Sequence, residues 1–169
     1  MRTLAGTLAE RERFYYINVV RPVLALFLAV SLVPSAHARS IKAARQQVVA
    51  GTLRYLAVPY LWGGQNPKTG LDCSGFVQLV YHNAGLVLPR VSEDQFKKTT
   101  RIRPKDVRPG DLVFFDMKHP GAANVDHVGI YVGKGYFVQA GVSTGIHIDS
   151  ILNPYYWSRL IAVRKYAGF

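Results

Sequence analysis

A single cysteine lies in the segment GLDCSGFVQLVY, residues 70–81. With no second cysteine for an internal disulfide, it would pair with another molecule, be buried and inert, or be reactive. Cys73 follows Asp72, a residue type that caps helix N-termini, and apolar residues recur after it at helical spacing. A thiol in the first helical turn lies near free N–H groups and the positive end of the helix dipole, which predicts a lowered pKa. The charge of Asp72 opposes that effect. An unreactive thiol buried on the apolar stripe is therefore the alternative.

A thiol nucleophile needs a base and a third group that orients the base. The strand-like run HVGIYVG, residues 127–133, places its apolar side chains on one face and His127 on the other. A glycine-flanked turn then predicts a hairpin to YFVQAG, residues 136–141. A three-residue loop would bring Gln139 to the face of His127, one diagonal step away, whereas a two-residue loop would turn it to the opposite face. His147, in a later strand-like run, is the alternative base, and a surface role is the simpler expectation for it.

The elements that must position these residues change type along the chain. Helical spacing predicts helices near residues 40–57 and 73–84, and a short helix over 92–98. Five short β-branched or aromatic runs follow, separated by Gly and Pro turns: residues 111–117, 127–133, 136–141, 145–151 and 160–166. Helices followed by strands predict an α+β domain built on an antiparallel sheet.

The first 38 residues have the pattern of a secretory signal peptide: a basic lead, an apolar run over 23–33, and small residues at Ala36 and Ala38. The run is shorter than the ~20 residues that span a bilayer, so we expect cleavage after Ala38 and no stable membrane insertion afterwards. Residues 39–169 form one predicted domain. They carry 17 basic and 8 acidic residues, since the leader holds four Arg and two Glu. We expect attraction to an anionic cell envelope and not to nucleic acid, although a solvated loop also explains the basic segment 97–105.

Several segments in one order resemble the NlpC family of papain-like cell-wall cysteine peptidases. They are PYLWGG, LDCSGFVQLVY, LPRVSEDQF, PGDLVFF, DHVGIYVGKGYFVQA and NPYYWSRLIAVRKY, and together they extend from about Ile41 to Tyr166. The resemblance is greatest to small periplasmic murein endopeptidases. It implies a papain-like fold with the nucleophile helix packed on an antiparallel sheet of five to six strands.

The resemblance also implies roles for particular residues. Cys73 would be the nucleophile, His127 the general base and Gln139 the group that orients it. Tyr60 would support the thiolate or the oxyanion. The substrate pocket would be formed by Asp72, Ser74, Arg90 and Ser92, with Val91 replacing the hydroxyl residue usual in the family. No metal or other cofactor is implied, and the sequence has neither H-E-x-x-H nor a cysteine pair for zinc.

The expected function is hydrolysis of an amide in peptidoglycan stem or cross-bridge peptides by an exported, periplasmic or secreted enzyme. Both a D-glutamyl–diaminopimelate bond and a D-alanyl cross-link fit this expectation. The alternatives are an amidase or acyltransferase acting on another substrate, a secreted wall-degrading toxin, and a non-catalytic wall-binding module. The sequence gives no indication of a protein partner.

Overall fold

The computed structural model describes residues 36–122 and 124–169. The elements below belong to the unit Ser40–Phe169, apart from the first turn of α3. The predicted leader lies outside the described residues except for its last three, so its cleavage stays a prediction. Within the described part of the chain, no helix has both the length and the apolar character needed to cross a membrane.

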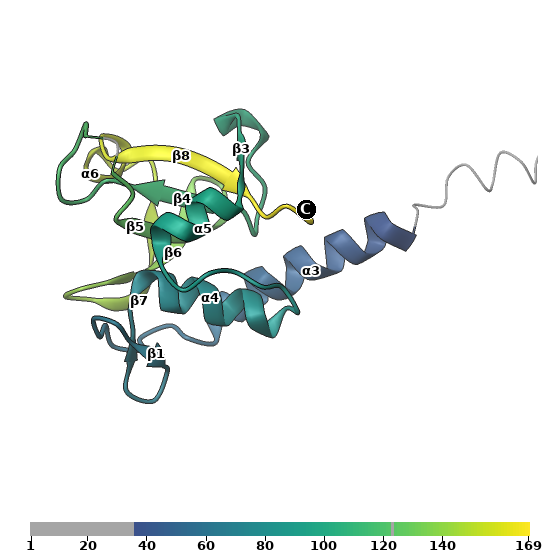
Figure 1. Cartoon of the computed structure of the whole chain (residues 1–169), viewed down its shortest axis with the longest axis horizontal. Coiled ribbons are helices and arrows are strands. Elements are labelled where there is room, and N and C mark those ends of the chain that lie inside the picture. The colour runs from purple at the N-terminus through teal and green to yellow at the C-terminus, as the bar shows by residue number, and fades with distance from the viewer. Residues whose placement is uncertain (1–35, 123) are drawn as a thin grey trace, which may run out of the picture. The chain divides into compact units, whose positions relative to one another are not determined.

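The predicted helices are present (Figure 1). Helix α3 spans Ala36–Leu53, α4 spans Cys73–Asn83 and α5 spans Ser92–Lys98. Helix α4 begins where the sequence indicates, because the carboxylate of Asp72 accepts a hydrogen bond from the N–H of Gly75 at 2.7 Å. Four shorter elements accompany them: the hairpin strands β1 (Gln65–Asn66) and β2 (Gly70–Leu71), the 3₁₀ turn η2 (Pro104–Asp106) and the helix α6 (Pro154–Trp157).

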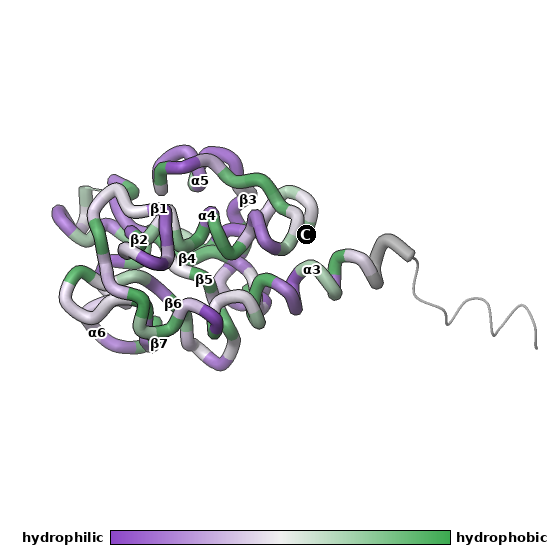
Figure 2. Tube along the Cα trace, turned by 90° about the horizontal axis from the view of Figure 1, so that it is seen from below, coloured by the Kyte–Doolittle hydropathy of each residue, from purple (hydrophilic) through white to green (hydrophobic). Residues whose placement is uncertain are grey.

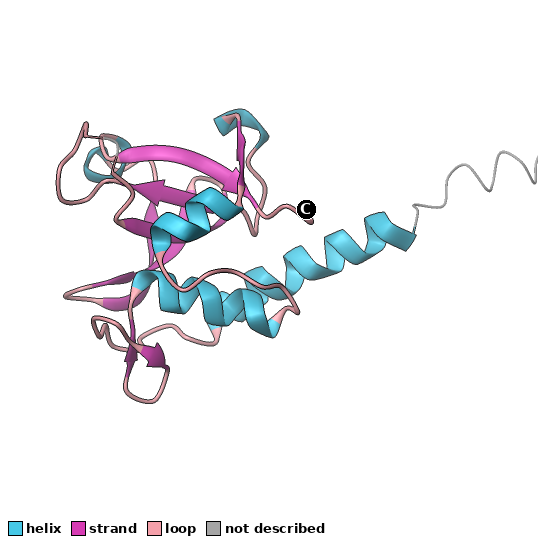
Figure 3. Cartoon of the chain, viewed as in Figure 1, coloured by secondary structure: helices cyan, strands magenta, loops and turns pink. Residues whose placement is uncertain are grey.

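One antiparallel sheet of six strands carries the second half of the chain (Figure 3). Its order is β3-β8-β4-β5-β6-β7, and every neighbouring pair is antiparallel. The strands are β3 (Thr100–Ile102), β4 (Leu112–Phe115), β5 (His127–Gly133), β6 (Tyr136–Gly141), β7 (Gly145–Ser150) and β8 (Leu160–Lys165). The five strands predicted from the sequence are therefore confirmed, and β3, from the basic segment, is the sixth strand that the predicted sheet of five to six strands allows.

The sheet is buried on both of its faces. Side chains of α3 and α4, such as Val48 and Phe76, pack with Val128 and Ile130 of β5 in one core. Tyr156 of α6 packs with four strand residues, Val113, Phe115, Phe137 and Val163, in a second core. The apolar stretches of α4, β4 and β5 lie together in Figure 2. The predicted α+β, papain-like arrangement, with the nucleophile helix on an antiparallel sheet, is confirmed.

Candidate active site

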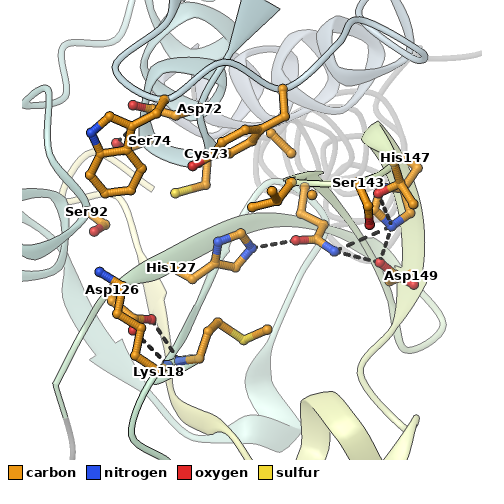
Figure 4. A pocket seen from close by; sticks show the side chains of 18 of the residues that line it. Asp72, Cys73, Ser74, Ser92, Lys118, Asp126, His127, Ser143, His147 and Asp149 are labelled. Atoms are coloured by element: carbon orange, nitrogen blue, oxygen red, sulfur yellow. Dashed lines mark hydrogen bonds and ion pairs between the residues drawn. The ribbon is translucent and has the colours of Figure 1, made fainter.

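A cleft of about 920 Å³ opens where the start of α4 meets β5 and β6. All eight residues singled out from the sequence line it: Tyr60, Asp72, Cys73, Ser74, Arg90, Ser92, His127 and Gln139. They come from the loop before α4, from α4 itself, from the connection between α4 and α5, from the start of α5 and from two strands, so tertiary folding alone brings them together. Figure 4 shows Cys73 and His127 directed into this space from opposite sides.

The β5–β6 hairpin has a two-residue turn but keeps the strand register predicted for a three-residue loop, and this register brings His127 beside Gln139. Gly133 pairs with Tyr136, which leaves a two-residue turn, but an irregularity after Tyr131 absorbs one residue. Tyr131 therefore pairs with Phe137, as the longer loop requires. Nε2 of His127 lies 2.5 Å from Oε1 of Gln139, and the other ring nitrogen is on the side of the thiol (Figure 4).

The thiol of Cys73 is buried at the first turn of α4. Burial raises its pKa to about 11, and the charge of Asp72 adds to the increase. The backbone N–H groups of Val128, Ser74 and Cys73 oppose that change without overcoming it. The expected lowering of the thiol pKa by the helix is therefore wrong for the free protein, because burial outweighs the first-turn N–H groups.

The imidazole of His127 is also shifted toward its neutral form. Burial lowers its pKa, while the hydrogen bond with Gln139 and the charges of Asp126 and Asp149 partly compensate. The free site at neutral pH therefore holds a neutral thiol next to a neutral base.

Gln139 has further partners that the sequence did not indicate. Its side chain is 3% exposed, and Nε2 donates to Oδ2 of Asp149 at 2.6 Å and to the hydroxyl of Tyr156 at 2.7 Å. Directly across from Gln139 on β7 is His147, whose Nε2 lies 2.5 Å from the same carboxylate oxygen. His147 thus lines the site, half-buried and with polar partners, whereas the sequence favoured a surface role for it.

On the other side of the cleft, Asp72 and Arg90 form a two-pronged ion pair. Arg90 donates to Oδ1 and Oδ2 of Asp72 at 2.9 and 2.6 Å, and also to the hydroxyl of Ser74 at 2.9 Å. Burial alone would raise the pKa of Asp72, but Arg90 and the N–H of Gly75 hold it below its usual range. Asp72 therefore caps α4 and carries a negative charge that Arg90 balances. The guanidinium of Arg90 forms part of the cleft wall.

The remaining predicted residues lie close to this group. Burial raises the pKa of the Tyr60 phenol, with the nearby Cys73 and Asp72 contributing, so its hydroxyl is a stable hydrogen-bond donor. Ser92 begins α5 and lines the cleft.

The rim of the cleft carries an exposed indole that sequence reasoning missed. Trp62 is 78% exposed, and Nζ of Lys118 lies 5.5 Å from its ring centre. The only signal in the sequence was its place in the aromatic loop before Cys73. Within residues 36–122 and 124–169, no three His, Cys, Asp or Glu side chains gather in a way that would hold a metal ion.

Residues 57–165 match the NlpC/P60 family. The chain is 41% identical over 117 residues to the bifunctional muramidase/DL-endopeptidase CwlT of Bacillus subtilis (strain 168), a match that covers 69% of this chain and 35% of CwlT. It is 34% identical over 135 residues to the murein DD-endopeptidase MepH of Escherichia coli (strain K12), which covers 77% of this chain and 49% of MepH.

A solved structure from Staphylococcus aureus subsp. aureus Mu50, described as similar to lipoprotein of the NLP/P60 family, has a TM-score of 0.65 to this chain. The two are 36% identical, and the match covers 72% of this chain and 41% of that one. The chain thus spans less than half the length of each of these three proteins. Because the matched segment contains every residue of the cleft described above, site and sequence agree: the chain belongs to the NlpC/P60 family.

Proposed function

We propose that this chain is a peptidoglycan endopeptidase that hydrolyses an amide bond of stem or cross-bridge peptides through a thioester on Cys73. The observation that carries the proposal is the arrangement of a thiol, an imidazole and an orienting amide in one cleft. The relatives CwlT and MepH, a DL- and a murein DD-endopeptidase by name, support the class of substrate.

The geometry indicates how the reaction would proceed. As Sγ of Cys73 attacks the amide carbon, the thiol proton passes to the free ring nitrogen of His127. The N–H groups of Cys73 and Ser74 lie beside the sulfur, and with the Tyr60 hydroxyl they are available to the developing oxyanion. The imidazolium of His127 then gives its proton to the leaving amine, and a thioester remains.

Hydrolysis of the thioester completes the cycle. A water molecule gives a proton to His127 as it attacks the thioester carbon, and the sulfur leaves and recovers its proton. Gln139 holds the ring throughout but carries no charge of its own to stabilise the imidazolium.

The proposal includes export, because peptidoglycan lies outside the cytoplasmic membrane. Its support is the signal-peptide pattern of residues 1–38. Sequencing the N-terminus of the protein recovered from outside the cytoplasm tests it: Arg39 as the first residue is expected, and an intact leader would contradict it.

Digestion of purified sacculi, with the released fragments identified by mass spectrometry, tests the activity. The native protein should release peptide fragments whose new ends identify the bond as D-glutamyl–diaminopimelate or as a D-alanyl cross-link. Cys73→Ala and His127→Asn should each lower the rate by about 10³-fold or more. His82→Asn is the matched control, since His82 is exposed on α4.

Each alternative function predicts a different outcome. If the protein were a non-catalytic wall-binding module, the Cys73→Ala variant would have the same effect on the cell wall as the native protein. An acyltransferase or amidase of another kind would leave stem peptides intact while turning over a different acyl donor. Unchanged sacculi at every pH tested would contradict the proposal.

A further inference from the structure

The orientation of the Gln139 amide decides which nitrogen of His127 can act as a base. An amide presents a carbonyl on one side and an NH₂ group on the other, and rotation by 180° exchanges them. If the carbonyl faces Nε2 of His127, Nε2 must carry the proton and the nitrogen on the thiol side is free. If the NH₂ group faces Nε2, the proton moves to the thiol side and the base is lost.

The contacts on the far side of the amide select one of these orientations. Asp149 presents a carboxylate, which accepts hydrogen bonds and cannot donate them when ionised. Oδ2 of Asp149 lies 2.6 Å from Nε2 of Gln139. If the Gln139 carbonyl oxygen took the place of Nε2, two oxygens would face each other without a proton between them. The Tyr156 hydroxyl is satisfied by the same orientation, since it accepts from Gln139 and donates to Asp149 at 2.8 Å.

From this arrangement we infer that Asp149 is a positioning residue, whose carboxylate fixes the Gln139 amide and through it the proton of His127 on Nε2. The inference rests on the proposed function for its catalytic consequence. It deepens that function by adding a fourth member, a carboxylate, behind a neutral amide. The chain then runs from Cys73 through His127 and Gln139 to Asp149.

Asp149 is itself held in place by several groups. The carboxylate oxygen that Gln139 reaches also accepts from Tyr156 and lies 2.5 Å from Nε2 of His147. The opposite nitrogen of that ring, Nδ1, lies 2.9 Å from the Thr144 hydroxyl and 2.9 Å from the Gly145 carbonyl. The β6–β7 register pairs Gln139 with His147, and Asp149 lies two residues along the same strand, so these three side chains share one face of the sheet.

The field of the carboxylate acts in the same direction as its hydrogen bond. Asp149 is one of the charges that raise the pKa of His127 against the effect of burial. Asp126, the residue before His127, also raises the His127 pKa, whereas His147 lowers it. A carboxylate near the ring therefore supports the imidazolium that forms during the reaction, which the amide alone does not.

A simpler explanation is that Asp149 only pairs with His147 at the edge of the sheet. The two explanations differ in what Asp149→Asn does to His127, because asparagine keeps the size of the side chain but has an NH₂ group of its own. An asparagine can accept the Gln139 amide in either orientation after its own rotation. The selection of one His127 tautomer would then be lost.

The test measures the tautomer directly and without a substrate. In protein labelled with ¹⁵N at histidine, His127→Asn assigns the ring signals, and the native protein near pH 8 should show the His127 proton on Nε2. Asp149→Asn should give a mixture or a proton on Nδ1, whereas Asp149→Glu and Tyr156→Phe should keep the native tautomer because they retain a carboxylate. Asp106→Asn, at an exposed carboxylate in the 3₁₀ turn Pro104–Asp106, is the matched control.

Kinetics on peptidoglycan fragments give the second measurement. Asp149→Asn should lower kcat by about 10- to 100-fold, the range seen when outer-shell carboxylates of metal-bound histidines are removed, with KM nearly unchanged. In a Gln139→Ala background the same substitution should have a much smaller effect, since only the through-space charge of Asp149 on His127 is then left to lose. An equal loss in both backgrounds would overturn the inference, as would an unchanged tautomer in Asp149→Asn.

The two proposals can fail separately. Inactivity of the native protein on every peptidoglycan fragment would contradict the proposed function, while the NMR result would still decide the role of Asp149. If Asp149→Asn does not fold, as judged by urea unfolding, Asp149→Ser provides the neutral variant for the same measurement.

Discussion

Burial acts on Cys73 and His127 in the same sense, because it favours the neutral form of each side chain. It raises the pKa of the thiol to about 11 and lowers that of the imidazole. A resting thiolate–imidazolium pair is therefore not the form of the free cleft. In the proposed reaction, negative charge on the sulfur develops only as the thiol proton passes to His127 during attack on the amide carbon.

This has a measurable consequence for the reactivity of Cys73, the only cysteine of the chain. With a pKa of about 11, the alkylation rate by iodoacetamide should keep rising with pH up to about pH 10. In urea the alkylation rate of the same thiol should level off once the pH exceeds its ordinary pKa of about 8.5. Rates followed by mass spectrometry decide the matter, and a plateau below pH 8 in the folded protein would show that a thiolate is already present.

At the scale of the elements, the sequence patterns predicted the helices and strands better than the contacts between them. Alternation in residues 127–133 and 136–141 put His127 and Gln139 on comparable faces, and the structure shows their contact. The choice of register depended on the loop, because a one-residue shift reverses every side chain. The observed two-residue turn, Lys134–Gly135 with both φ positive, is compatible with that contact only because the strand has an irregularity next to it.

Asp149, Tyr156 and Trp62 could not be predicted as members of the site for a different reason. Asp149 lies in an edge strand and Tyr156 in a short helix of the connection to β8, where polar or aromatic residues are ordinarily exposed. Asp149 and Tyr156 reach Gln139 only because β7 pairs with β6 and α6 folds over the sheet. The thiol pKa departs from its sequence-based prediction for a related reason, since burial of Cys73 is a property of the packed molecule.

Gly129 is a position at which β5 packs tightly against β6. A Cβ atom there would come within 2.6 Å of Cδ2 of Phe137 and 3.0 Å of the Val138 carbonyl oxygen. Phe137 is fully buried and packed against Phe115 and Tyr156, so its ring has little room to move.

Gly129→Ala should therefore destabilise the protein by about 1–3 kcal/mol and displace His127 from Gln139. Urea unfolding measures the first effect, and the His127 ring signals in ¹⁵N NMR measure the second. Gly129→Ala/Phe137→Leu should recover part of the stability, because the smaller side chain vacates the contact. Full stability in the single variant would show that the strands separate more easily than the packing indicates.

At the scale of the folded unit Ser40–Phe169, Arg45 connects α3 with the segment that leads into β4 and with Phe169. Arg45 of α3 lies 2.8 Å from Oδ1 of Asp111, donates to the Pro109 carbonyl at 3.1 Å, and stacks 4.2 Å from the ring centre of Phe169. The contact with Oδ1 is an ion pair and not a well-aligned hydrogen bond. Burial raises the pKa of Asp111, although Arg45 and the N–H of Arg108 partly offset it. A carboxyl whose pKa is raised by folding contributes stability below its unfolded pKa of about 3.9, and that contribution is lost as the pH rises through the folded value.

Arg45→Met should therefore cost about 3 kcal/mol at pH 7, because it leaves the carboxylate of Asp111, 1% exposed, without a counter-charge. Losing Arg45 also raises the pKa of Asp111 further, so the cost should shrink as the pH falls toward 4 and the carboxyl takes up a proton. Arg45→Met/Asp111→Asn should recover part of the loss at pH 7 and show a flatter pH dependence. Urea unfolding across this pH range measures both effects, with Arg54→Met, at an exposed arginine, as a control expected to change stability by less than about 0.5 kcal/mol. A cost for Arg45→Met that is constant between pH 7 and pH 4 would mean that α3 is held by its apolar contacts and by Phe169, and not by the charge of Asp111.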